Sequence, residues 1–158
     1  MNHYHGILAL EIGTSIGTIL RQLSRNFSIV IGTDIDFYSL KHLVMLSKNE
    51  RVICCDAASA IHNLKFDLIV FNPPYLPNTI YHDDKTIDGG PTGIEVSFHF
   101  LTNAMDNLSS HGKILMLISN LSNGERLVQL IDKLNLKMQI IAQKKLFYET
   151  LQIIELSA

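Results

Sequence analysis

Four consecutive residues, Asn72-Pro73-Pro74-Tyr75, have types and a spacing that suit chemistry on a flat amino or amide group. They follow the apolar run 68–71, which is typical of a buried strand. Because neither proline offers an N–H to a sheet, the strand must end and the chain must turn there. An amide, fixed carbonyls and an aromatic ring then lie at a strand's carboxyl end, where open α/β sheets bind their ligands. This tetrapeptide predicts a binding site for a planar NH2-bearing group.

A purely structural role is open for the same residues. Asn72 could be a turn residue that bonds to its own backbone, and Tyr75 a loop aromatic that covers the edge of the core. The two prolines between them, at the end of a buried strand, favour the functional interpretation.

The segment 11–17, Glu-Ile-Gly-Thr-Ser-Ile-Gly, follows the first expected strand and precedes a helix. Here Gly13, Thr14, Ser15 and Gly17 are expected to bring backbone N–H groups close to a ligand. The dinucleotide fingerprint requires glycine at three set positions, and serine and threonine occupy two of them. A nicotinamide cofactor is therefore disfavoured.

Three acids close the first three expected strands, at Glu11, Asp34 and Asp56. The carboxylate of Glu11 would repel a pyrophosphate and would suit a cation, such as the sulfonium and ammonium of S-adenosylmethionine. Asp34 is placed to accept from ribose hydroxyls, whereas Asp36 is expected to cap the next helix. Asp56 either accepts from the adenine amino group or caps the next helical stretch. The neighbours Ile35 and Ala57 complete the predicted cofactor contacts.

Strand and helix patterns alternate along the chain, and the strands are continuous apolar runs. This indicates one α/β domain over residues 1–158, with a mostly parallel sheet covered by helices on both faces. Strands are expected over 7–10, 28–31, 52–55, 66–71, 113–119, 138–142 and 151–156, the last two as a hairpin. Helices are expected over 18–25, 40–44, 58–63, 98–108 and 127–134, and a long loop over 73–92.

Composition limits the classes of protein. Of the 158 residues 47% are apolar and 18% charged, with a net charge of −2, so no basic surplus supports nucleic-acid binding. The longest aliphatic stretch, 114–118, is too short for a membrane span and residues 1–5 do not resemble a signal peptide, so a cytoplasmic protein without membrane contact is expected. The histidines are scattered, and no metal site is expected. The adjacent Cys54 and Cys55 point to opposite faces of a strand, which argues against a disulfide.

Taken together, these residues resemble the class I S-adenosylmethionine-dependent methyltransferases, which have a Rossmann-like seven-stranded sheet with a C-terminal antiparallel hairpin. The tetrapeptide resembles the motif of HemK-type glutamine methyltransferases and adenine-N6 methyltransferases. Segments 89–96 and 144–151 resemble the Gly-Gly-x-x-Gly-x-Glu-Val segment and the closing hairpin of the small archaeal and eukaryotic HemK relatives. Ser15 departs from the family by replacing a glycine.

The resemblance implies methylation of the glutamine in the Gly-Gly-Gln loop of a translation release factor. It also implies a small zinc-binding activator subunit as partner. The run 52–55 lacks protective charges and is expected at the edge of the sheet, where such a partner would dock strand to strand. An adenine-N6 methyltransferase of DNA or RNA, and an inactive cofactor-binding scaffold, are the alternatives.

Overall fold

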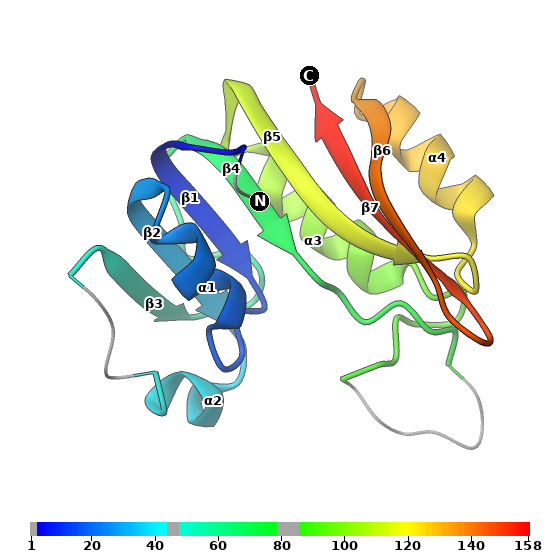
Figure 1. Ribbon diagram of the computed structural model, residues 1–158, viewed down its shortest axis with the longest axis horizontal. Helices are drawn as coiled ribbons and strands as arrows, with labels where there is room; N and C mark the ends of the chain where they lie inside the picture. The colour runs from blue at the N-terminus through cyan, green and yellow to red at the C-terminus, as the bar shows by residue number, and fades with distance from the viewer. Residues whose placement is uncertain (1–2, 44–47, 79–85) are drawn as a thin grey trace.

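The computed structural model describes residues 3–43, 48–78 and 86–158. Seven strands form one sheet in the order β3-β2-β1-β4-β5-β7-β6 (Figure 1). They are β1 (Gly6–Ile12), β2 (Phe27–Asp34), β3 (Glu50–Cys54), β4 (Phe66–Phe71), β5 (Leu108–Ser119), β6 (Lys137–Lys145) and β7 (Thr150–Ser157). The helices are α1 (Thr18–Leu23), α2 (Phe37–Lys41), α3 (Glu95–Met105) and α4 (Gly124–Lys133).

All neighbouring strands are parallel except β7, which runs antiparallel to β5 and β6. The predicted fold class, a mostly parallel seven-stranded sheet with a C-terminal hairpin, is confirmed. Because parallel strands need long crossovers, helices follow β1, β2 and β4, whereas β3 and β4 are joined without a helix.

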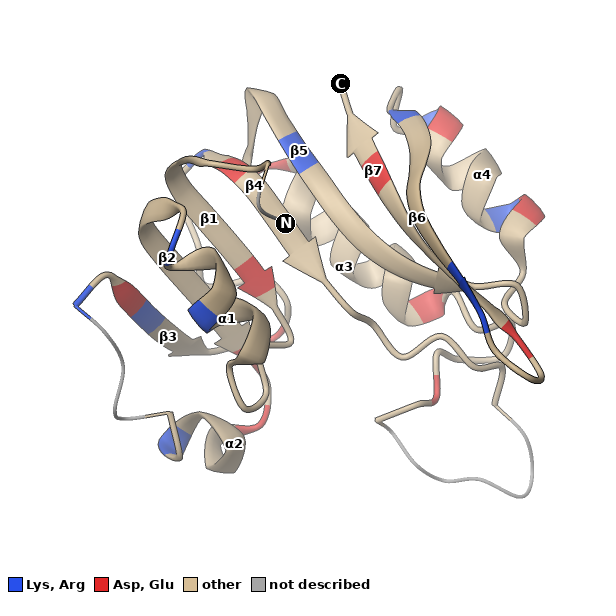
Figure 2. Cartoon of the chain, viewed as in Figure 1, with Lys and Arg blue, Asp and Glu red and all other residues tan. Residues whose placement is uncertain are grey.

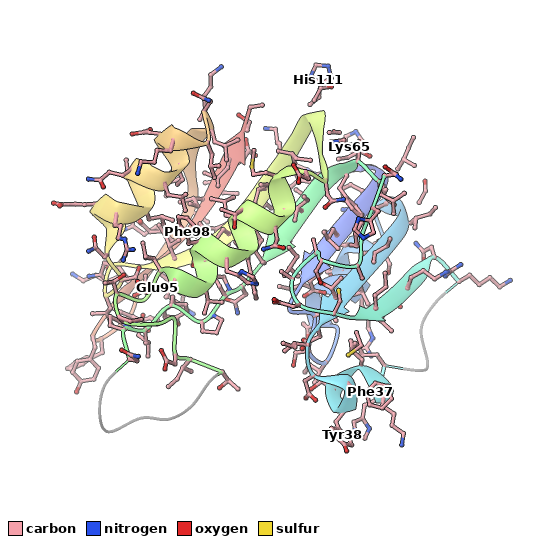
Figure 3. All side chains as sticks on the ribbon, turned by 180° about the vertical axis from the view of Figure 1, so that it is seen from behind. Phe37, Tyr38, Lys65, Glu95, Phe98 and His111 are labelled. Atoms are coloured by element: carbon pink, nitrogen blue, oxygen red, sulfur yellow. The ribbon has the colours of Figure 1, made fainter. Side chains whose placement is uncertain are left out.

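Helices lie on both faces of the sheet, with α1 on one and α3 and α4 on the other (Figures 1 and 3). Leu20 and Leu23 of α1 pack with Val30 and Leu68 in one core cluster. The opposite cluster is larger and includes Leu101 of α3. Two covered faces explain why the central strands are apolar at successive positions instead of alternating.

Two local expectations were wrong. Residues 58–60 form a turn and 61–63 are irregular instead of helical, although Ala58 and Ile61 still bury their side chains in the core. The strand expected from Lys113 begins at Leu108, which had been placed on the preceding helix face. Leu108 pairs with Phe66, and this pairing takes the residue into the sheet despite its helical spacing.

Strand β3 lies at one edge of the sheet and β6 at the other. The edge position predicted for 52–55 is therefore confirmed for the part that forms β3. Cys54 and Cys55 are both free, as expected. Among the described residues, no helix has the length and apolar content needed to cross a membrane.

Candidate active site

The crevice at the carboxyl ends of β1 and β4 brings the first turn and the tetrapeptide together. In the parallel pairing of these strands, Glu11 lies beside Val70 and Ile12 beside Phe71. The next residues on each strand, Gly13 and Asn72, therefore leave the sheet side by side. Residues separated widely in sequence meet here because two parallel strands end at the same level.

Backbone hydrogen bonds tie the first turn to the end of β2. The N–H groups of Gly13 and Thr14 both donate to the Thr33 carbonyl, at 2.8 and 2.9 Å. The Ser15 N–H donates to the Asp34 carboxylate at 2.7 Å. Ser15 has a φ of 45°, a left-handed conformation that disfavours residues with a Cβ. Ser15 therefore adopts a backbone conformation that glycine reaches more easily.

Gly13 leaves open space above this turn. It is exposed and has a φ of 74°, and a Cβ built on it would meet only the Phe100 ring of α3, at 3.8 Å. A ligand can therefore approach the backbone of the turn closely. Gly17 has a different role, because it begins α1 as its N-cap residue and donates its N–H to the Thr14 carbonyl.

The carboxyl group of Glu11 is buried below the turn, with only 3% of the residue exposed. It accepts a 2.6 Å hydrogen bond from the Thr14 hydroxyl. Burial raises the pKa of Glu11 to about 7, and the nearby Asp34 charge adds to the rise while the Thr14 bond opposes it. A buried acid in this state favours a cation beside it, because the cation would offset the cost of ionising the acid.

Asp34 links the ends of two elements. One carboxylate oxygen accepts from Ser15 N–H and the other accepts from Asp36 N–H at 2.9 Å. Each carboxylate oxygen has a second acceptor position, so these bonds leave capacity for hydroxyl donors. Asp36 caps α2 by accepting from the N–H groups of Tyr38 and Ser39, as predicted.

Asp56, after β3, interacts with a residue that the sequence did not point to. Its carboxylate oxygens lie 2.9 and 3.0 Å from Nε2 of His99 on α3. The side chain thus forms no helix cap, one of the two roles considered for it. Ala57 next to it is buried with a φ of 47°, whereas Ile35, after β2, is exposed.

His99 and Phe100 bring α3 to the crevice, and sequence reasoning missed both. His99 reaches Asp56 across 43 positions, and Phe100 packs edge-on against Phe71, with ring centroids 5.9 Å apart. No local pattern carries this information, because the contacts depend on how α3 crosses the sheet.

The tetrapeptide forms an extended segment after β4, with Asn72 exposed, Pro73 buried and the next two residues half-buried. Within residues 3–43, 48–78 and 86–158, nothing forms a hydrogen bond with the Asn72 side chain. Its amide is therefore free to bind a ligand. Burial raises the pKa of the Tyr75 hydroxyl, and the Glu149 carboxylate at the β6–β7 turn raises it further.

Residues 87–95 support the tetrapeptide from below. The Leu76 N–H donates to the Ile87 carbonyl at 3.1 Å, and the Leu76 carbonyl accepts from Gly89 at 2.8 Å. A Cβ on Gly93 would come within 2.5 Å of the Tyr75 carbonyl oxygen, and Gly93 has a φ of 75°. The glycines of this segment therefore permit direct backbone contact with the tetrapeptide.

Glu95, the first residue of α3, holds the same segment in place. Its carboxylate accepts from the Thr92 N–H at 3.0 Å and from the Thr92 hydroxyl at 2.8 Å, and it pairs with Arg126 of α4 at 2.9 Å. Burial tends to raise the pKa of Glu95, but these hydrogen bonds lower it below its usual value. Positions 89–95 are thus a structural support for the site.

An apolar cavity of about 470 Å³ opens beside Asn72 on the α1 face of the sheet. Its walls include Tyr4, Val70, Leu117 and Ile153. The acids of the first turn are not among its lining residues, so the cavity borders the candidate site at Asn72 but does not include the part that suits a charged ligand. In the described ranges, no group of three or more His, Cys, Asp or Glu side chains is arranged to hold a metal ion.

This sheet order and this crevice define a Rossmann-like class I methyltransferase. Over 97% of the chain, the fold matches a ribosomal protein L11 methylase from Lactobacillus delbrueckii subsp. bulgaricus, covering 71% of that chain with a TM-score of 0.68 and 16% identity. It matches a chain of the Mtq2–Trm112 complex of E. cuniculi over 99% of this chain and 87% of that one, with a TM-score of 0.79 and 26% identity. That complex is described as responsible for methylation of the eRF1 translation termination factor.

The sequence gives the narrower assignment. Over 156 residues it is 30% identical to the putative protein N5-glutamine methyltransferase MJ0928 of Methanocaldococcus jannaschii, covering 92% of this chain and 78% of the relative. A ribosomal protein uL3 glutamine methyltransferase of Francisella tularensis is 27% identical over 84 residues, which are 48% of this chain and 27% of that protein. No family model matches. The chain belongs to the protein N5-glutamine methyltransferases.

Proposed function

We propose that this chain transfers a methyl group from S-adenosylmethionine to the side-chain nitrogen of a glutamine in a translation release factor. The observation that carries the proposal is the free, exposed amide of Asn72 beside the open turn at Gly13. The Asn72 amide suits the acceptor glutamine, and the turn at Gly13 suits the cofactor. The E. cuniculi complex that methylates eRF1 supports the choice of substrate.

The crevice fits S-adenosylmethionine by its donors, acceptors and charge. Glu11 suits a positively charged methionine end, the Gly13–Ser15 turn leaves room for close approach, and Asp34 keeps acceptor positions for ribose hydroxyls. Asp56 would accept from the adenine amino group, and Gly17, Ile35 and Ala57 would complete the walls. When bound, this cofactor supplies a methyl group activated by a sulfonium.

The residues of the tetrapeptide would then orient the acceptor. The Asn72 side-chain oxygen and the Pro73 carbonyl accept the two N–H groups of the glutamine amide, which directs the nitrogen lone pair toward the methyl group. Pro74 stiffens the corner, and Tyr75 packs on the flat amide and excludes water. The bound cofactor would supply the methyl group with a neutral thioether as its leaving group, and the amide held by Asn72 and Pro73 would lose one proton to water. Alignment and fixed acceptors supply the rate gain.

Charge favours a protein acceptor over a nucleic acid. Lys and Arg residues are scattered along the described elements instead of forming one band, and acidic residues mark the ends of β1 and β2 (Figure 2). A nucleic-acid methyltransferase needs cations along a phosphate backbone. The adenine-N6 alternative therefore has no support from the surface.

Methyl transfer to purified release factor tests the function directly. Wild type with labelled S-adenosylmethionine is expected to label release factor, and replacing the glutamine of its Gly-Gly-Gln loop by alanine should abolish the label. Asn72→Ala should lower kcat at least a hundredfold, roughly the loss seen when one fixed transition-state contact is removed, with unchanged thermal unfolding. Labelling of DNA or RNA in place of release factor would contradict the proposal.

A small zinc-binding activator subunit is proposed to dock on the outer edge of β3, which pairs with no other strand of the described sheet. The Cys55 N–H donates inward to the Asp34 carbonyl at 3.0 Å. Because these groups alternate along a strand, the N–H groups of Val52 and Cys54 point outward to the edge. They offer a parallel or antiparallel partner two donors. The Trm112 partner of Mtq2 in the E. cuniculi complex supports this assembly.

Proline substitution at the edge tests the docking. Cys54→Pro removes an outward N–H without removing a bond to β2, so it should prevent co-purification with a Trm112-like subunit while the chain stays folded. The same yield of complex with Cys54→Pro as with wild type would show that the subunit binds elsewhere. A wild-type chain that is monomeric, stable and fully active alone would remove the need for the subunit.

A further inference from the structure

The turn between β6 and β7 carries a ridge of three apolar residues, Leu146, Phe147 and Tyr148. Phe147 is 91% exposed and Tyr148 85% exposed, and Leu146 is exposed as well. The two rings pack edge-on against each other, with centroids 4.7 Å apart. An aromatic pair held in solvent is typical of a surface that is covered when a partner binds.

The base of this ridge is firmly fixed. The Leu146 N–H donates to the Glu149 carbonyl at 2.8 Å and closes the turn. The Glu149 carboxylate accepts from the Ser119 hydroxyl at the end of β5, at 2.7 Å. The Thr150 N–H donates to the Asn120 side chain at 2.6 Å. The exposed rings therefore project from a turn whose position relative to β5 is set before any partner arrives.

The ridge also lies close to the tetrapeptide. The turn of the β6–β7 hairpin is at the same end of the molecule as the segment that follows β4 (Figure 1). The Glu149 charge is near enough to Tyr75 to affect its hydroxyl. A chain segment that places one side chain against Tyr75 would thus have its flanking residues near Phe147 and Tyr148.

We propose that the ridge of Leu146, Phe147 and Tyr148 is a second contact surface for the protein substrate, binding the polypeptide that flanks the acceptor glutamine. This inference rests on the proposed function, because it assumes a protein acceptor at the tetrapeptide. Apolar rings suit the backbone and aliphatic side chains of a polypeptide loop. Within the described β6–β7 turn, Lys144 and Lys145 are the cations beside the ridge, too few for a phosphate backbone.

Steady-state kinetics of the full chain with release factor test the ridge. The double variant Phe147→Ala/Tyr148→Ala is expected to raise KM for release factor about tenfold or more, as removal of central interface aromatics does. The kcat value and the affinity for S-adenosylmethionine should not change, since both rings are exposed to solvent and neither belongs to the proposed cofactor or acceptor contacts. Exposed side chains contribute little to folding, so thermal unfolding should match wild type.

A matched control exists at the opposite end of the crevice. Phe37 and Tyr38 of α2 form another exposed edge-on pair, 60% and 75% exposed, with centroids 6.1 Å apart (Figure 3). Phe37→Ala/Tyr38→Ala is expected to leave KM for release factor unchanged. The exchange Phe147→Tyr/Tyr148→Phe keeps two rings at the ridge, so this variant should have the same KM for release factor as wild type.

Each outcome separates the ridge from the proposed function. A wild-type chain that does not methylate release factor overturns both proposals. Wild-type activity with unchanged KM in the Phe147→Ala/Tyr148→Ala variant overturns the ridge alone, as does an equal rise in KM for the control pair. Loss of binding to a single-stranded DNA oligonucleotide, with unchanged KM for release factor, would assign the ridge to nucleic acid and overturn the proposal.

Discussion

Gly93 and Tyr75 are in direct backbone contact, so closely that a Cβ on Gly93 would come within 2.5 Å of the Tyr75 carbonyl oxygen. This contact joins residues 18 positions apart and sets the distance between the tetrapeptide backbone and the segment that leads into α3. The glycine segment and the tetrapeptide behave as one unit in this structure. The geometry of the proposed acceptor site therefore depends on a residue that has no side chain to offer a substrate.

Replacing Gly93 by alanine should damage activity and stability together. The new Cβ must displace the Tyr75 backbone, and alanine is strained at a φ of 75°. We expect the free energy of unfolding to fall by about 2 kcal/mol and methyl transfer to fall at least tenfold. Denaturant unfolding and a release-factor methylation assay measure the two effects.

Gly124→Ala is the control for that substitution. Gly124 begins α4, and a Cβ there would meet nothing within 4 Å. Alanine favours a helix, so stability should stay the same or rise by up to about 1 kcal/mol, with normal activity. Equal losses in Gly93→Ala and Gly124→Ala would contradict a role for the contact between Gly93 and Tyr75.

The buried Glu11 should make stability depend on pH. Its pKa is about 7 in the folded chain against 4.5 for the free side chain, so the folded state binds the proton more tightly. Its contribution to the free energy of unfolding is complete below pH 4.5 and declines by about 3 kcal/mol as pH rises through 7. Glu11→Gln removes this titration.

Unfolding in urea at pH 5 and pH 8 tests the effect of Glu11. Both proteins share all other titrating groups. From pH 5 to pH 8, wild type should therefore lose more free energy of unfolding, or gain less, than Glu11→Gln. The variant should also bind S-adenosylmethionine less tightly at pH 8, since it lacks the carboxylate. A difference that is constant with pH would show that Glu11 does not titrate in this range.

Asp34 and Asp36 should separate cofactor binding from helix capping. Asp34→Ala removes the acceptor of the Ser15 N–H and the expected acceptor for ribose, so affinity for S-adenosylmethionine should fall at least tenfold. Asp36→Ala removes the cap of α2 but leaves the bond between Ser15 and Asp34 in place. We expect lower stability with nearly normal affinity for Asp36→Ala, measured by calorimetric titration. The reverse pattern would exchange the two roles.

His99 is expected to affect cofactor binding only through Asp56. Their side chains are 46% and 53% exposed, so the pair should contribute at most about 1 kcal/mol to folding. His99→Ala should therefore leave stability almost unchanged and weaken binding of S-adenosylmethionine modestly. Asp56→Ala should weaken it more, because it removes the proposed adenine acceptor. Unchanged affinity in Asp56→Ala would place the adenine elsewhere.

Much of the fold could be predicted because its signals are local. Apolar runs with intervening helical spacing gave the alternation of strands and helices, and an aspartate before α2 gave its cap. Local signals failed at Leu108, where pairing with Phe66 prevails over helical spacing, and at 58–63, where core contacts hold a turn and irregular backbone. The residues His82, Asp83 and Asp84 of the expected loop lie outside the described part of the chain.

The sequence by itself determined the family and placed the residues of the candidate site at strand ends, because proline, glycine and buried strands constrain the backbone locally. Only the tertiary structure decided which of these residues meet. Gly13 lies beside Asn72, Gly93 contacts Tyr75, and the His99 ring lies within hydrogen-bond distance of the Asp56 carboxylate. These contacts join residues far apart in the chain, and they are set by strand register and by the path of α3 over the sheet. Neither the strand register nor the path of α3 produces a periodic pattern in the sequence, since each depends on how whole elements pack.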